Sequence, residues 1–171
     1  MNRSIARVQK TNSIFATFFL ATLFVQSLAF ASGSYPDGPD LTQTPGKLCE
    51  TDAVKRYPEG ISYCGRNVSS DTKNAIIQIY DQKFGFQISK MNRGDFKIDH
   101  FIPLSIGGSN SIENLWPQYR QVYEITDPIE QLLSNKIAAG RIKQVDAVRL
   151  IKVAKLNLSK ADEITHLIEA M

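Results

Sequence analysis

The chain has 171 residues, of which 20 are basic and 17 acidic, and it contains two cysteines. The first 31 residues hold Arg3, Arg7 and Lys10 but no acidic residue, so the rest of the chain carries 17 charges of each sign and is about neutral. This balance excludes binding to a polyanion through net charge. Any affinity for phosphate must come from local clusters of basic side chains.

Residues 1–31 have the organisation of a cleaved secretory signal. The basic start is followed by an apolar run over residues 14–30, and Ala29-Phe30-Ala31 gives the small-x-small pattern at which signal peptidase cuts. A membrane anchor is the alternative, but a run of about 17 residues is short for a span of roughly 20. We therefore expect a secreted or periplasmic protein that keeps no membrane span after cleavage.

Residues 32–48 are rich in Gly, Ser, Pro and Asp, which predicts an extended and mobile lead-in. Residues 49–171 are then long enough for one domain with a modest core. The cysteines, Cys49 and Cys64, predict a disulfide because an even pair in an exported chain is normally oxidised. The bridge would close a loop of about 16 residues and contribute roughly 3 kcal/mol. Half of a zinc site is the alternative, but the chain has no Cys-x-x-Cys.

The middle of the chain shows a helical pattern and then a hairpin pattern. Apolar residues recur at helical spacing over residues 71–83, and Gly85 can end that helix. Residues 96–102 predict a strand, residues 107–110 a tight turn and residues 114–116 the start of the return strand.

The last third of the chain predicts further helices. One is expected within residues 119–139, where Asp127-Pro128-x-Glu130 looks like a helix N-terminus in its own right, with Asp127 as the cap and Pro at the first helical position. Residues 145–154 and 159–170 predict the last two helices. The expected fold is α+β, with a β-hairpin surrounded by four or five helices.

The most informative stretch is Asp99-His100-Phe101-Ile102-Pro103-Leu104, followed by Gly107-Gly108 and then by Asn114-Leu115-Trp116-Pro117-Gln118. Successive strand residues point to opposite faces, so the Asp99 carboxylate can face a metal ion while the His100 imidazole faces a phosphate beside it. An imidazole with its ordinary pKa near 6.5 can take a proton from water at neutral pH. The pair therefore favours metal-assisted hydrolysis over a purely structural role.

This motif resembles that of the HNH (ββα-metal, His-Me finger) endonucleases, in the form of their small secreted bacterial members. The resemblance covers about residues 64–154 and is tightest over residues 96–118. It implies a ββα-metal core that carries one divalent ion. It also implies that His100 is the general base, that Asp99 is the first metal ligand and that the side-chain amide of Asn114 bridges the hairpin loop.

The third part of the family pattern differs here, because no histidine lies between His100 and His166. Asp127 and Glu130 resemble the Asp-x-x-Glu that follows Asn-Leu-Trp-Pro in the secreted relatives, and residues three apart share a helix face, so both are candidate metal ligands. The alternative for each is a role in a helix cap. Oxygen ligands would favour Mg²⁺, with Mn²⁺ or Ca²⁺ next, over Zn²⁺.

Phosphate contacts are expected from Arg66, Lys97 and Arg120, which would hold a nucleic-acid backbone without reading its sequence. Each can equally be a solvated surface charge. The expected function is hydrolysis of DNA, or of RNA, outside the cytoplasm and without sequence specificity. Two alternatives stay open: a catalytically inactive HNH-like envelope module that binds or supports, and a toxin with an immunity or inhibitor protein as its partner.

Overall fold

The computed structural model describes residues 35–51 and 53–171. The expected signal, residues 1–31, lies outside them. The described part is a mixed α+β fold with two short antiparallel hairpins and four α-helices, which confirms the α+β expectation. In chain order the elements are β1 (Lys55–Arg56), β2 (Ile61–Ser62), α1 (Ser70–Phe84), β3 (Phe96–His100), β4 (Leu115–Tyr119), α2 (Arg120–Ala138), α3 (Gln144–Leu156) and α4 (Ala161–Glu169).

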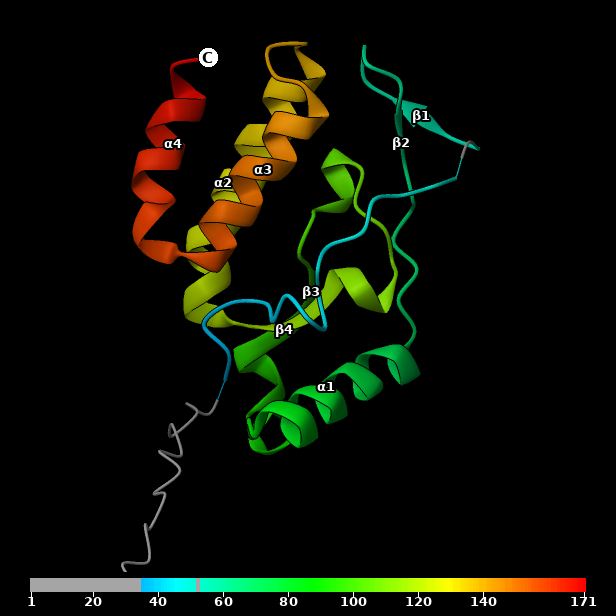
Figure 1. The fold of residues 1–171 in the computed structure, drawn as a ribbon, viewed down its shortest axis with the longest axis vertical. Coiled ribbons are helices and arrows are strands. Elements are labelled where there is room, and N and C mark those ends of the chain that lie inside the picture. Colours follow the sequence, from blue (N-terminus) through cyan, green and yellow to red (C-terminus); the bar gives the residue numbers. More distant parts are fainter. Residues whose placement is uncertain (1–34, 52) are drawn as a thin grey trace, which may run out of the picture. The chain divides into compact units, whose positions relative to one another are not determined.

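The β3–β4 hairpin lies between α1 and the group formed by α2, α3 and α4 (Figure 1). Its register places Asp99 opposite Trp116 and His100 opposite Leu115. The first strand ends at His100, two residues earlier than expected, because the chain turns at once into the loop that Asn114 holds. The return strand begins at Leu115, one residue after the expected start.

Helix α1 shows both of its end signals. The Ser69 side chain accepts a hydrogen bond from the Thr72 amide, and Gly85 ends the helix in the left-handed conformation at φ 76°. These bounds agree with the prediction over residues 71–83. Helices α3 and α4 likewise match the predicted residues 145–154 and 159–170, although α4 starts only at Ala161, after a 3₁₀ turn over Leu158–Lys160.

Helix α2 corrects one expectation. It runs without a break from Arg120 to Ala138, so Pro128 lies inside it and Asp127 is not an N-cap. Proline removes one backbone hydrogen bond and crowds the carbonyl four residues before it. The helix continues because one buried stripe crosses the proline without a change of phase; its members are Val122, Thr126, Ile129, Leu133 and Ile137.

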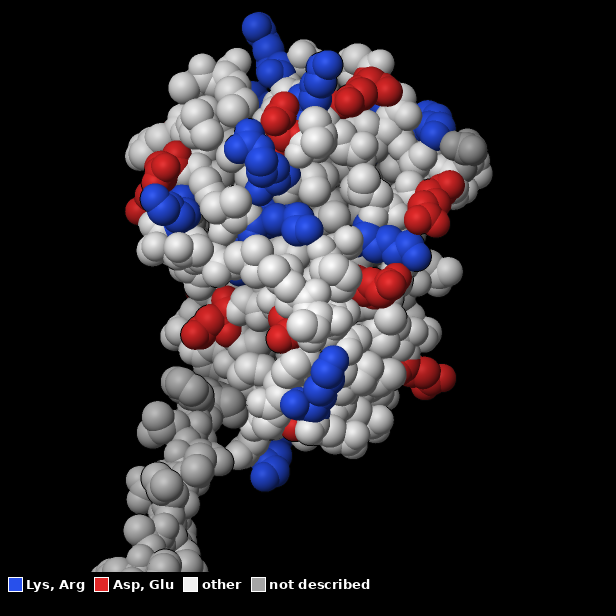
Figure 2. Space-filling view, in the orientation of Figure 1, with Lys and Arg blue, Asp and Glu red and all other residues white. Residues whose placement is uncertain are grey.

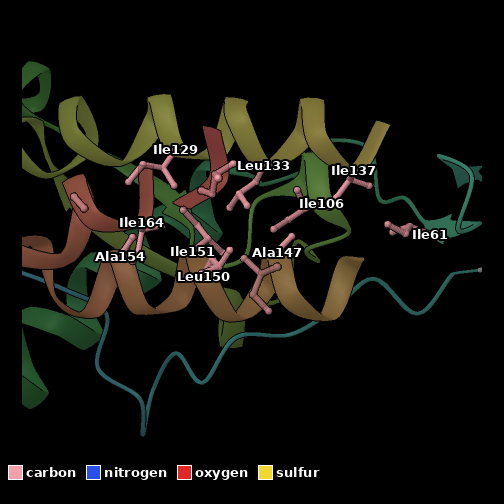
Figure 3. Close-up of a cluster of buried hydrophobic side chains, with 13 residues drawn as sticks. Ile61, Ile106, Ile129, Leu133, Ile137, Ala147, Leu150, Ile151, Ala154 and Ile164 are labelled. Atoms are coloured by element: carbon pink, nitrogen blue, oxygen red, sulfur yellow. The ribbon is translucent and has the colours of Figure 1, made fainter. Parts of the chain in front are cut away.

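Two apolar clusters fix the hairpin. The first joins α2, α3 and α4, and Figure 3 shows Ile129 and Leu133 of α2 facing Ile151 of α3. The second joins α1 to the hairpin through buried side chains such as Tyr80 and Trp116. Burial of Trp116 in this cluster gives it a core role.

The described part of the expected lead-in, residues 35–48, contacts the rest of the fold. Thr44 is fully buried, and its hydroxyl lies 3.0 Å from the Tyr80 hydroxyl and donates to the Leu115 carbonyl at 3.1 Å. Leu48 pairs with Gly108 in an isolated β-bridge. The Gly- and Pro-rich composition reveals the extended backbone but not the partners that hold it.

The expected disulfide is present between Cys49 and Cys64, which are 15 positions apart. It closes the segment that holds β1, β2 and the turn between them. None of the helices in the described part of the chain is both long and apolar enough to cross a membrane.

Candidate functional site

His100 lies at the end of β3 and is almost completely buried, with 2% of its surface exposed. Its Nε2 lies 3.1 Å from the Asn110 side-chain oxygen, and the Asn110 amide nitrogen donates to the Gly65 carbonyl at 2.7 Å. This second bond fixes the orientation of the amide, so Nε2 must carry the proton toward Asn110. A neutral His100 ring then has its lone pair on Nδ1, which lies 4.0 Å from Oδ1 of Asp99.

The environment of His100 favours the neutral ring. Burial lowers its pKa below the ordinary 6.5, and this effect exceeds the raising effect of the Asn110 hydrogen bond and the Asp99 carboxylate. The positive charges of Arg66 and Lys155 lower the pKa further. At neutral pH the imidazole can therefore accept a proton.

Asn114 holds the loop between His100 and the return strand. Its side-chain oxygen accepts from the Ile102 amide at 2.8 Å, and its side-chain nitrogen donates to the Ile102 and Ser109 carbonyls at 2.9 Å each. The residue is fully buried. These bonds connect the chain that follows β3 to the chain that precedes β4, as the resemblance implies for this position.

The glycine pair permits this close packing. Gly107 adopts φ +92°, which side chains rarely adopt, and ends a 3₁₀ turn. A Cβ at Gly108 would overlap the carbonyl oxygen of Ile102. The loop can therefore approach the end of β3 only with glycine at this position.

Three carboxylates form one cluster, and it includes Asp99, the chain neighbour of His100. Asp99 on β3 and Asp127 and Glu130 on α2 each offer one oxygen, and these oxygens lie within 4.8 Å of one another. Asp127 and Glu130 share a face of α2 because they are three residues apart. The structure thus brings together all three residues that the sequence indicated as metal ligands.

Two ammonium groups lie in the same cluster. Lys97 Nζ is 2.8 Å from both Asp127 carboxylate oxygens and 3.3 Å from Asp99 Oδ2. Lys155 Nζ is 2.6 Å from Glu130 Oε1 and 3.7 Å from Asp99 Oδ2. Lys97 was expected to contact phosphate, but in this structure its charge is directed at carboxylates.

The two buried carboxyl groups respond differently to this environment. Burial raises the pKa of Glu130, and the negative charges of Asp99 and Asp127 add to that increase, although Lys155 opposes it. Burial acts in the same direction on Asp99, but Lys155 and Lys97 outweigh it and hold the Asp99 pKa below its usual range.

The cluster could hold one divalent ion through oxygen ligands. All three ligand atoms are carboxylate oxygens, which suit Mg²⁺, Mn²⁺ or Ca²⁺. Asp99 Oδ2 and Glu130 Oε1 are buried and lack a hydrogen bond of good geometry. The Lys97 side chain is 35% exposed. It can therefore turn toward solvent, which would leave the oxygens of Asp99 and Asp127 free to bind an ion.

The expected phosphate contacts are distributed unevenly. Arg66 is exposed and lines a cavity of about 290 Å³ together with Arg56, Tyr63 and Glu130. Arg120 instead donates to the Gly94 carbonyl at 2.7 Å, at the opposite end of β3 from His100. The structure therefore brings Arg66, but not Arg120, to the region of the carboxylates.

Sequence reasoning missed Lys155 and Asn110. Lys155 lies four residues after Ile151 on the buried side of α3, so a lysine in an apolar helical stripe was the available signal. In the sequence, Asn110 looks like an ordinary turn residue because it follows Gly107-Gly108. Its contact with Gly65 joins chain segments 45 positions apart, so local sequence signals do not reveal it.

Charged side chains on the face drawn in Figure 2 are of both signs, with basic groups gathered over the upper helices and acidic groups scattered around them. This distribution fits the near-neutral chain and leaves local clusters as the source of any phosphate affinity. Compared with family models, with curated proteins and with solved structures, the chain has no match, and the geometry of the site therefore carries the argument for function.

Proposed function

We propose that this protein is a metal-dependent endonuclease of the HNH type that hydrolyses phosphodiester bonds of DNA, or of RNA, without sequence specificity. The observation that supports this most strongly is the buried His100 imidazole next to Asp99, which is one of three clustered carboxylates. Its Nε2 is tied to Asn110, and its Nδ1 is 4.0 Å from Asp99. A base and a set of hard oxygen ligands are the two components that such hydrolysis requires.

Each residue has a role in the proposal. Nδ1 of His100 accepts the proton of the attacking water, and Asn110 keeps the ring in the required tautomer. Asp99, Asp127 and Glu130 would hold the divalent ion, which when bound stabilises negative charge on the phosphate and on the leaving oxygen. The turn held by Asn114 keeps β3 and the following loop in register.

The substrate backbone would enter beside Glu130. Arg56 and Arg66 are among the residues that line the 290 Å³ cavity there, and guanidinium groups suit phosphate oxygens. Contacts of this kind bind a nucleic-acid backbone without reading bases. The disulfide between Cys49 and Cys64 is compatible with a secreted or periplasmic location.

A second candidate is a non-catalytic module with the same hairpin, which binds a partner or supports the envelope. The observation that favours it is the pairing of the carboxylates with Lys97 and Lys155. Two ammonium groups offset most of the negative charge that would attract a divalent ion. In that case His100 and Asp99 would stabilise the fold without turning over a substrate.

Cleavage assays separate the two candidates. Protein purified from expression of the full chain is incubated with supercoiled plasmid and with RNA, in chelator and in Mg²⁺, Mn²⁺, Ca²⁺ or Zn²⁺ separately. We expect cleavage with at least one ion, its loss in His100→Ala and a reduction of at least tenfold in Asp99→Ala. His166→Ala is the matched control, since that side chain is 82% exposed on α4. No cleavage under any condition refutes the endonuclease proposal.

The ligand role of α2 has its own control. Asp127→Asn should reduce the rate at a fixed ion concentration and raise the ion concentration needed for half-maximal rate. Glu124→Gln, an exposed substitution on the same helix, should do neither. Equal behaviour of the two variants would remove Asp127 from the ligand set.

A further inference from the structure

Lys155 is the least expected residue of the site. It is fully buried in the last turn of α3, where its neighbours Ile151 and Ala154 belong to the apolar core. Removing an ammonium group from water costs several kcal/mol unless oxygen partners replace the water. A lysine at this position therefore needs a compensating set of oxygens.

The surroundings of Lys155 supply that set. Its Nζ donates to the His100 carbonyl at 2.6 Å, lies 2.6 Å from Glu130 Oε1 and lies 3.7 Å from Asp99 Oδ2. Oxygen atoms from β3 and α2 thus surround one positive charge. Two of the three carboxylates that could hold a divalent ion are the same ones that contact this ammonium.

We propose that Lys155 is a built-in cation that competes with a divalent ion for Glu130 and Asp99. It holds β3 and α2 together when no ion is bound, and it makes the site bind divalent ions weakly. This inference rests on the proposed cation site and adds its regulation: occupancy depends on the external ion concentration, because the protein supplies part of the required charge itself.

The two lysines have different roles in this competition. Lys97 has a side chain that is 35% exposed, so it can move into water when an ion arrives. Lys155 has no such route, because its side chain is completely enclosed. An ion at the three carboxylates therefore stays within a few ångströms of a fixed positive charge, and the repulsion between the two charges weakens ion binding.

Replacement of Lys155 by methionine tests the inference, since it keeps much of the side-chain volume and removes the charge. Mn²⁺ affinity is measured by titration calorimetry without nucleic acid, and thermal stability is measured in chelator and in 10 mM Mn²⁺. We expect the Lys155→Met variant to bind Mn²⁺ at least tenfold more tightly than the unaltered chain. We also expect its melting temperature to be lower in chelator and to recover with the ion.

Two further variants make the test decisive. Lys152→Met changes a lysine on the same helix whose Nζ contacts the Pro45 carbonyl, and it should leave Mn²⁺ affinity unchanged. The double variant Lys155→Met/Glu130→Gln removes both partners of the ion pair, and it should fold in chelator without any gain in affinity. Folding of Lys155→Met only in the presence of Mn²⁺ also supports the inference.

Three results would overturn it. The first is a Lys155→Met variant that folds but binds Mn²⁺ no more tightly than the Lys152→Met control. The second is a Lys155→Met variant that stays unfolded with Mn²⁺ while the double variant folds. The third is low-micromolar Mn²⁺ affinity in the unaltered chain. The outcome is independent of cleavage: tighter binding without nuclease activity would keep this inference and refute the proposed function, and cleavage with unchanged affinity would do the reverse.

Discussion

Substitution of Asn114 by alanine tests how the loop after β3 is held in place. The change removes the hydrogen-bond partner of the Ile102 amide and of the Ile102 and Ser109 carbonyls, all in a fully buried environment. An unpaired buried backbone group costs about 1–3 kcal/mol. Because local relaxation and water entry recover part of this, we expect the free energy of unfolding to fall by about 4 kcal/mol.

Urea denaturation measures this loss directly. With an m-value of about 2 kcal/mol/M, the midpoint should fall by roughly 2 M while the m-value stays the same. Asn114→Asp should be about as destabilising, because its second carboxylate oxygen would face the two carbonyls that the amide nitrogen now satisfies. Asn67→Ala changes an exposed side chain and should stay within about 0.5 kcal/mol of the unaltered chain. A loss below about 1 kcal/mol in Asn114→Ala would refute the reasoning.

Further predictions concern the turn, the disulfide and the histidine. Gly108→Ala should cost at least about 2 kcal/mol in thermal or urea unfolding, because its Cβ would overlap a backbone carbonyl oxygen, and an equally stable variant would contradict this. Cys49→Ser/Cys64→Ser should lower the free energy of unfolding by about 3 kcal/mol, and a cost under about 1 kcal/mol would show that the loop is held by other contacts. Since burial lowers the pKa of His100, the unfolded chain takes up its proton first as pH falls, so stability in chelator should decline below pH 6.5 by at most about 1.4 kcal/mol per pH unit. His100→Gln should lose this decline while His166→Gln keeps it, and identical pH dependence in the two variants would contradict the assignment.

Local sequence signals were sufficient for most of the fold. Helix α1 is bounded by a serine cap and a left-handed glycine, both of which are visible in the sequence. The hairpin followed from the apolar stretch over residues 96–102 and from the turn residues at Gly107 and Gly108. Such signals depend only on neighbours along the chain, so they can be read without knowledge of the packing.

Failures arose where tertiary packing outweighs a local signal. Asp127-Pro128 has the composition of a helix start, but burial on both sides of the proline keeps α2 continuous. Thr44 lies in a segment with the composition of a loop, and its buried hydroxyl lies 3.0 Å from the Tyr80 hydroxyl. Neither the packing around Pro128 nor the contact between Thr44 and Tyr80 could be identified from the sequence alone.

The sequence predicted the carboxylates and the histidine of the candidate site, but it did not predict the lysines that offset the negative charge. Asp99, Asp127 and Glu130 were all indicated by the motif and lie together. Lys155 was not, because its role depends on a contact between α3 and the end of β3, and residue spacing along the chain does not reveal such a contact. The sequence therefore indicated a site with negative charge, whereas the structure has a site whose charge is largely compensated.

In the proposed mechanism the imidazole of His100 removes a proton from water, and a phosphodiester is cleaved with the help of a bound cation. The most direct measurement is the initial rate of plasmid cleavage in saturating Mg²⁺ or Mn²⁺ for the unaltered chain and for His100→Gln, with folding of both confirmed by circular dichroism. We expect a loss of at least 100-fold, in the range that general-base catalysis contributes. Equal rates in the two proteins would contradict the account.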